Sequence, residues 1–240
     1  MSGHSKWAKI KRQKGVNDQA RGVLFAKLGR MITLAVIEGG GIDPNLNVRL
    51  RLAIEKAKSE NTPKENIERA IEKGGGADQL KLKEVHYEAF GPEGVALYIT
   101  ASTDNSNRTN AEIRNTLERN GGKVGGQGAT AYLFTQLGMV TVSKEVHTED
   151  EIFEIGDTLN VIDIDEDETS ITIFFPFEIL GKAKERISNK KTSIPEQVFR
   201  SLTSVTVSSS EIEEKVIHLV SALEELDDVH AVYTNMEFIN

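Results

Sequence analysis

The stretch GMVTVSKEVHTEDEIFEIGDTLNVIDIDEDETSITIFFPFEILGKAKERI, residues 138–187, decides the fold of the second half of this chain. Its first six residues alternate as in a strand, and a capping box at Thr148 and Glu151 predicts a short helix with Phe153 among its apolar residues. "NVIDID" and "SITIFF" predict two strands around an acidic turn. A helix follows Pro176, and with a last strand near residue 200 the order is β-α-β-β-α-β, the ferredoxin-like signature.

The segments on either side of this module predict a second α/β domain. Strands are expected at "EVHYEAF", "GVALYITAS", "TAYLF", "TSVTVS" and "VHAVYTNMEF". Capping boxes at Thr109 with Glu112 and at Ser210 with Glu213 predict two helices. We therefore expect an α/β domain made of residues 79–135 and 202–240, with a ferredoxin-like domain, residues 136–201, inserted into it.

Three helices are expected before this point, within an N-terminal domain over residues 1–78. The first begins near Asp18, the second carries Leu46 at the start of its apolar face, and the third begins at a capping box of Thr62 and Glu65. Gly74-Gly75-Gly76 ends the third helix. The fold class is thus α+β, and the helical core is predicted to contain Leu24, Leu28, Met31, Ile32, Leu50, Ile54, Ile67 and Ile71.

Charge is distributed unevenly along the 240 residues, whose formal net charge is -8. Residues 1–73 contain 15 Lys and Arg against 8 Asp and Glu, whereas residues 74–240 contain 14 against 29. Such an asymmetry suggests a polyanionic partner for the basic end. The chain has no cysteine, which excludes disulfides and thiolate chemistry and fits a cytoplasmic location. No apolar run approaches the roughly 18 residues that a membrane span needs.

The opening segment MSGHSKWAKIKRQKG holds five cations, no carboxylate and the only tryptophan, Trp7. Lysine and arginine neutralise phosphates, and an aromatic ring can stack on an unpaired base. Two other interpretations remain open: a solvated basic tail, and Trp7 as an anchor that packs on the helices. Arg21, Lys27 and Arg30 extend the positive charge onto the first helix, which favours a binding surface over a tail.

Other motifs give weaker indications. Each of the five histidines is isolated in the sequence, and the acidic run at 163–168 lacks the pattern of a calcium loop, so no metal or other cofactor is predicted. Neither a hydrolase nucleophile elbow nor a nucleotide phosphate loop is present. Gly125-Gly126-Gln127 matches the tripeptide that peptide-release factors place beside an ester bond, but a flexible turn is the simpler interpretation.

Five blocks, "GHSKWAKIK", "RLRLAIEKAKSENTPKENIERAIEKGGG", "YEAFGPEGVALYI", "DNSNRTNAEIRNTLERNGG" and "LEELDDVHAVYTNMEF", resemble the YebC family along essentially the whole chain. That family includes probable transcriptional regulators and a mitochondrial translational activator of cytochrome oxidase. The resemblance implies three domains, no enzyme activity and nucleic-acid binding. The family's basic N-terminal block corresponds here to Ser5, Lys6, Trp7, Lys9, Lys11, Arg12, Lys14 and Arg21. Gln13 and the loop at 123–128 depart from the family's usual residues.

The leading hypothesis is a non-enzymatic regulator of gene expression that binds nucleic acid. The family label implies promoter DNA; the alternative is a ribosome-bound translation factor that uses ribosomal or transfer RNA and relieves stalled, proline-rich elongation. RNA is favoured, because no recognition helix is evident and the acidic remainder of the chain would repel an enveloping duplex. A third hypothesis is an esterase-like activity at Gly125-Gly126-Gln127. We expect a monomer that does not bind membranes.

Overall fold

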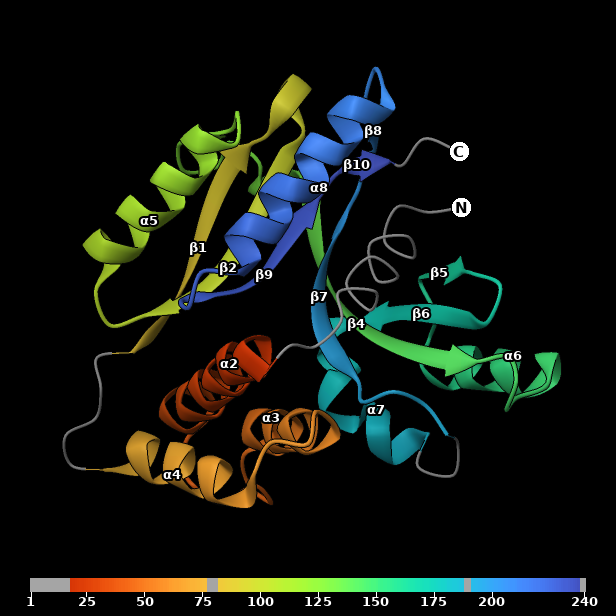
Figure 1. Ribbon diagram of the computed structural model, residues 1–240. Coiled ribbons are helices and arrows are strands. Elements are labelled where there is room, and N and C mark those ends of the chain that lie inside the picture. The colour runs from red at the N-terminus through yellow and green to blue at the C-terminus, as the bar shows by residue number, and fades with distance from the viewer. Residues whose placement is uncertain (1–17, 77–81, 188–190, 238–240) are drawn as a thin grey trace. The chain divides into compact units, whose positions relative to one another are not determined.

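The computed structural model describes residues 18–76, 82–187 and 191–237, with side chains from Arg21 onward. They form two compact units (Figure 1). The inserted unit consists of the described residues within 135–200, and the main unit consists of those before 135 and after 200. The predicted α+β class is confirmed, whereas the finer division of the main unit at residue 78 stays a prediction. Within the described residues, no helix is long and apolar enough to cross a membrane.

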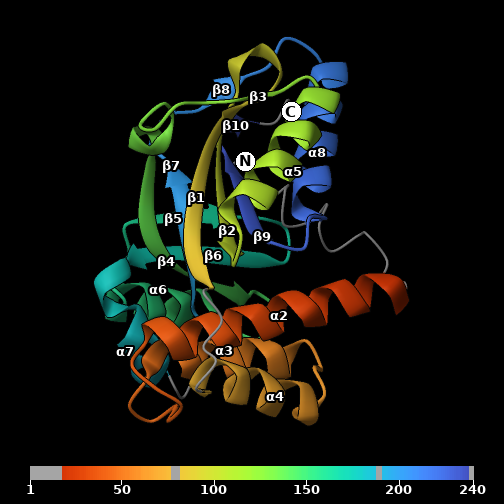
Figure 2. The same ribbon diagram turned by 90° about the vertical axis from the view of Figure 1, so that its left-hand side faces the viewer.

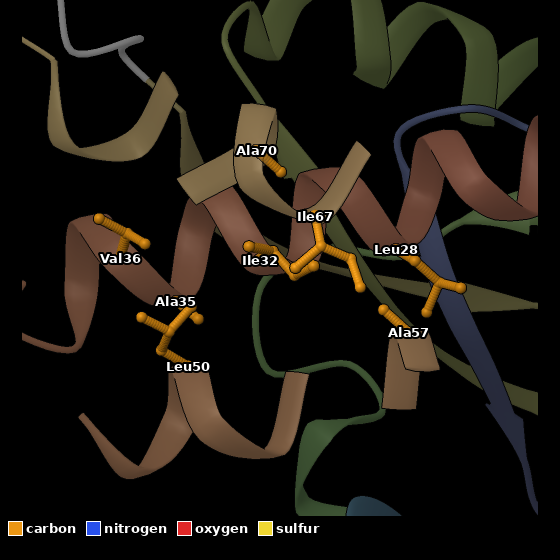
Figure 3. Packing of buried hydrophobic residues seen from close by; sticks show 8 residues of the cluster. All are labelled: Leu28, Ile32, Ala35, Val36, Leu50, Ala57, Ile67 and Ala70. Carbon is orange, nitrogen blue, oxygen red and sulfur yellow. The ribbon is translucent and has the colours of Figure 1, made fainter. Parts of the chain in front are cut away.

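The helical region of the main unit contains α2 (Asp18–Glu38), α3 (Val48–Ser59) and α4 (Lys64–Gly75). Four of the predicted core residues are buried, and Leu24, Ile54 and Ile71 pack on them half-buried. Figure 3 shows the buried side chains of this core: Leu28, Ile32, Ala35, Val36, Leu50, Ala57, Ile67 and Ala70.

Two predictions about this region are wrong. Met31 is 36% exposed, and Leu46 is 85% exposed. Leu46 precedes α3, because Asn47 is the residue that caps it by accepting from the backbone N–H of Leu50 at 2.9 Å. The helical spacing assumed for Leu46 therefore does not apply.

The capping box predicted for α4 is also wrong. Pro63 occupies the cap position with extended backbone, and the helix begins at Lys64. This places Glu65 second in the helix, one position short of a capping box. The Thr62 hydroxyl is buried and has no hydrogen-bond partner within the described residues.

The sheet of the main unit is antiparallel and has the order β3-β1-β2-β9. Its strands are β1 (Lys83–Phe90), β2 (Ala96–Thr103), β3 (Lys123–Val124) and β9 (Val229–Thr234). Helices α5 (Ser106–Arg119) and α8 (Ser210–Glu224) lie side by side on one face (Figure 2). Short elements complete the unit: η1 (Pro92–Gly94), η2 (Ala131–Leu133) and the parallel pair β8 (Val205–Thr206) and β10 (Met236–Glu237).

Three predicted details of this unit need correction. Helix α5 begins earlier than predicted, with Asn105 as its cap, and Thr109 is buried inside the helix. The cap of α8 is Ser209 and not Ser210. The segment "TAYLF" forms the 3-10 turn η2 before a strand begins at Phe134.

The inserted unit has the ferredoxin-like topology predicted from its element order. It contains β4 (Phe134–Ser143), α6 (Glu149–Thr158), β5 (Asp163–Glu166), β6 (Ser170–Pro176), η3 (Phe177–Ile179), α7 (Leu180–Arg186) and β7 (Glu196–Ser201). The sheet order is β5-β6-β4-β7, with antiparallel pairs. The capping box of Thr148 and Glu151 is confirmed. Phe153, one of the apolar residues expected in this helix, is 79% exposed.

Candidate nucleic-acid interface

The structure describes one residue of the basic block to which nucleic-acid binding was assigned. Arg21 lies on α2 and is exposed. The others lie outside the described residues: Ser5, Lys6, Trp7, Lys9, Lys11, Arg12 and Lys14.

The two further cations on α2 are engaged within the main unit. Lys27 donates to the backbone carbonyl of Glu224, and a guanidinium nitrogen of Arg30 donates to the carboxylate of Asp228. Lys27 and Arg30, which were expected to extend the basic surface along α2, are thus engaged by Glu224 and Asp228 of the same unit. Sequence alone could not have shown this, since 198 positions separate Arg30 from Asp228.

Asp228 binds three donors that come from two helices. Besides Arg30, it accepts from Arg108 at 2.9 Å and from the hydroxyl of Thr109 at 2.5 Å. Its side chain is only 3% exposed. Burial by itself raises the pKa of Asp228, but the hydrogen bonds from Thr109 and Arg108 and the charge of Arg30 outweigh it and hold the pKa below its ordinary value. Asp228 is therefore an anion at neutral pH that binds α2 and α5 together.

Helices α3 and α4 are joined by four residues, 60–63, the spacing of a helix-turn-helix. Asn61 has φ +58°, a left-handed conformation that allows the tight turn. However, the exposed surface of α4 carries carboxylates at Glu65, Glu68 and Glu72, which offset its exposed cations Lys64, Arg69 and Lys73. Lys64 is already paired with Glu68 at 3.3 Å. A helix with these carboxylates is poorly suited to lie between the phosphates of a major groove.

The glycine-rich loop after β3 is fixed to the sheet by Glu88. The Glu88 carboxylate accepts from the backbone N–H groups of Gly128, Thr130 and Ala131 at 2.6, 2.6 and 2.7 Å. Burial raises the pKa of Glu88, but these three hydrogen bonds outweigh it and lower the pKa below its ordinary value. Gln127 directly precedes the first of these anchors and is exposed. These hydrogen bonds fix the loop to β1 and leave Gln127 at its surface.

The histidines of the described residues offer no metal centre, since no group of three or more His, Asp or Glu there could hold an ion. His86 is bonded to the hydroxyl of Tyr98 at 2.7 Å. Both ring nitrogens of His230 are buried without a hydrogen-bond partner, and burial together with the charge of Lys27 lowers the pKa of His230 to about 4. His230 is thus neutral at neutral pH and suits packing, not acid–base chemistry.

Comparison with known proteins gives matches over most of the chain. Residues 5–77 match the TACO1/YebC protein N-terminal domain, and residues 82–236 match the TACO1/YebC second and third domain. A probable transcriptional regulatory protein from Chloroflexus aurantiacus is 42% identical over 99% of this chain and 96% of its own length. A probable transcriptional regulatory protein from Chloroherpeton thalassium is 40% identical over 99% and 96%. The crystal structure of a conserved hypothetical protein from Aquifex aeolicus matches with a TM-score of 0.86 and 38% identity over 93% of both chains.

Proposed function

Because the chain belongs to the TACO1/YebC family, several of whose members are named probable transcriptional regulatory proteins, we propose that it is a non-enzymatic regulator of gene expression that binds nucleic acid. The observation that carries the proposal is the basic N-terminal segment. Within residues 5–14 it holds five cations and Trp7 without a carboxylate, in a chain whose net charge is -8. Such a segment is suited to phosphates and to stacking on a base.

RNA is the nucleic acid that the surface of the helical region favours. A duplex bound through α3 and α4 would bring its phosphates close to Glu65, Glu68 and Glu72. An extended basic segment with one aromatic side chain can instead follow the irregular backbone of RNA and stack on an unpaired base. We therefore propose a cytoplasmic monomer that acts on ribosomal or transfer RNA at the ribosome; promoter DNA is the alternative.

The first experiment measures the affinity of the full chain for three labelled probes of equal length: single-stranded RNA, an RNA hairpin and duplex DNA. The N-terminal segment, residues 5–14, holds five cations. If all five met phosphates, the slope of log K against log salt would be about -3.5 to -4.5, at ~0.7–0.9 per contact. The proposal predicts tightest binding to the hairpin.

The variant for this experiment replaces Lys9, Lys11, Arg12 and Lys14 by Ala. It should weaken RNA binding strongly and flatten the salt slope by about 3, because four phosphate contacts are lost. The matched control removes four lysines of other regions, by replacing Lys182, Lys184, Lys191 and Lys215 with Ala. If both variants lose affinity equally, only overall charge matters and the N-terminal segment is not the binding site.

Crosslinking in cells followed by sequencing of the bound nucleic acid tests the choice of target. Enrichment of ribosomal or transfer RNA is the expected result, and enrichment of promoter DNA would contradict the proposal. The absence of enzymatic function is tested separately. Gln127→Ala should leave growth and RNA binding unchanged, whereas loss of function in cells with normal RNA binding would revive the esterase-like hypothesis.

A further inference from the structure

The inserted unit contains the most acidic tract of the chain. Residues 145–181 hold 12 Asp and Glu and no Lys or Arg. They form α6, β5, the turn after it, β6 and η3. This tract has the opposite charge to the N-terminal segment, which holds five cations and no carboxylate in residues 5–14. The two are therefore electrostatically complementary.

Large apolar side chains are exposed on the same tract. Phe153 on α6 is 79% exposed, and Ile162 and Ile164 at β5 are 57% and 52% exposed. Val161 is 43% exposed and packs on Gly156, which lies one helical turn after Phe153. Ile162 and Ile164 are two residues apart along extended chain and share one face. An apolar surface thus runs from α6 to β5, and we call it the β5 surface.

Strand β5 is also an edge of its sheet. Its inner side pairs with β6, and no other strand of the described residues pairs with its outer side. Figure 1 shows β5 at the end of this sheet. Edge strands offer backbone donors and acceptors to a further extended segment, and natural proteins usually protect them. Here the edge strand carries the exposed Ile164 beside the exposed carboxylates of Asp163 and Glu166, which discourage an acidic strand but not a basic segment.

Some carboxylates of this tract are paired with an arginine, and others are exposed to solvent. Asp163 and Asp165 are bound by Arg200, at 2.7 and 2.8 Å, so they are already compensated. Glu149, Asp150 and Asp157 are exposed on α6 and lie four residues before, three before and four after Phe153. The exposed phenylalanine is therefore surrounded by negative charge, which favours an occupant that is both basic and apolar.

We infer that the β5 surface binds the N-terminal segment of the same chain, Ser5–Lys14, and withholds it from nucleic acid. The segment combines Trp7 and Ile10 with five cations, which is the composition that the surface requires. Seventeen residues precede the described part of α2. Fully extended they span at most about 55–60 Å, enough to reach across a small domain.

The effect of this docking on RNA binding rests on the proposed function, because the docked segment is the proposed RNA-binding segment. RNA and the β5 surface would compete for the same five cations of the N-terminal segment. If the segment were docked roughly nine-tenths of the time, RNA affinity would be lowered about tenfold, since the apparent Kd varies inversely with the competent fraction. Salt should weaken this docking, because exposed charge pairs are screened.

Trp7 is the only tryptophan and therefore reports on the segment in the full chain without nucleic acid. At low salt its emission should be shifted to shorter wavelength and protected from acrylamide, and at about 0.5 M salt both effects should diminish. The double variant Phe153→Ser with Ile164→Lys should expose Trp7 already at low salt. The control Tyr132→Ser with Leu202→Lys changes residues that are 69% and 65% exposed elsewhere and should behave as wild type.

Three results would overturn the inference. Trp7 could be exposed at both salt concentrations, or it could be protected equally in wild type and in the Phe153→Ser, Ile164→Lys variant. Protection that rises with protein concentration would mean docking onto a second copy. Circular dichroism confirms that both variants are folded, as expected for exposed positions.

RNA affinity separates this inference from the proposed function. At low salt the Phe153→Ser, Ile164→Lys variant should bind RNA up to about tenfold more tightly than wild type, and the difference should vanish at high salt. A Trp7 response without RNA binding would refute the proposed function alone. RNA binding without a Trp7 response would refute the docking alone.

Discussion

The inserted unit and the main unit each bury an aspartate against arginine, but the two sites are assembled differently. In the inserted unit, the guanidinium of Arg200 donates to both carboxylate oxygens of Asp165, at 2.9 and 2.8 Å. It also lies 4.1 Å from the centroid of the Phe174 ring. These residues come from strands of one sheet. The inserted unit thus contains its own compensation for the buried charge.

In the main unit, the charge of Asp228, which precedes β9, is compensated by residues far away in the sequence. Its donors Arg30, Arg108 and Thr109 belong to α2 and α5. A second contact, from Arg49 on α3 to Glu84 on β1, also joins the helical region to the sheet. The comparison teaches that the inserted unit compensates its buried aspartate within its own sheet, whereas the helical region (residues 18–76) depends on partners from the rest of the main unit.

The largest effect is expected at Arg200. Arg200→Met leaves Asp165, whose side chain is 1% exposed, buried without the guanidinium that binds it. Breaking a buried pair in this way costs about 3–5 kcal/mol of unfolding free energy. Hydrogen exchange should accelerate throughout residues 135–200 and remain unchanged in α2. Exchange that accelerated in α2 as well would contradict the view that the Arg200 site stabilises the inserted unit alone.

A double variant serves as the control for Arg200. Combining Arg200→Met with Asp165→Leu removes the buried carboxylate together with the guanidinium that binds it. Replacing a whole buried ion pair by apolar residues is often neutral for stability. Most of the lost stability should therefore return. If the double variant were as unstable as the single one, packing of Arg200 on Phe174 would be the larger contribution.

Asp228→Ala should have the next largest effect, about 2–3 kcal/mol. This is smaller because the groups left behind, Arg30 and Arg108, are 29% and 43% exposed and can regain water. Amides of α2 should exchange faster, and those of residues 135–200 should not. Asp228→Asn keeps an acceptor for Thr109 and should lie between wild type and Asp228→Ala. Unchanged exchange in α2 would show that Asp228 does not hold the helical region.

The contrast between local and long-range contacts also explains which features of the structure the sequence predicted. The ferredoxin-like order of the inserted unit and four buried residues of the helical core followed from local periodicity, because both depend on neighbouring residues. The engagement of Lys27 and Arg30 could not be predicted, because their partners Glu224 and Asp228 are close only in the folded chain. Helix starts failed where a competing cap, Asn105, stood a few residues away.

The stabilisation contributed by Glu84, which joins the helical region to the sheet through Arg49, should depend on pH. The hydrogen bond from His86 outweighs partial burial and, together with Arg49, lowers the pKa of Glu84 from 4.5 to about 2. Since the folded pKa lies below the unfolded one, the stabilisation is present above pH 4.5 and is lost as the pH falls toward 2. Solvent screening limits it to about 1 kcal/mol.

The measurement for Glu84 compares urea unfolding of wild type and Glu84→Gln between pH 7 and pH 2.5. The difference in unfolding free energy should be about 1 kcal/mol at pH 7 and should shrink steadily below pH 4.5. Glu211→Gln on α8 is a suitable control, since the ion pair of Glu211 within the described residues is with the exposed Lys215 of its own helix. A difference independent of pH would mean that the charge of Glu84 does not stabilise the fold.

Effects of about the same size or smaller are expected at the two predicted capping boxes, one in each region. In the inserted unit the Thr148 hydroxyl accepts from the N–H of Glu151 at 3.3 Å, so Thr148→Ala should cost about 1 kcal/mol. In the helical region the Thr62 hydroxyl is buried without a partner within the described residues. Thr62→Val keeps the shape and removes an unsatisfied polar group, so it should be neutral or stabilise by up to about 1 kcal/mol. Urea unfolding measures both variants, and a loss at Thr62 equal to that at Thr148 would show that Thr62 has a hydrogen-bond partner in solution.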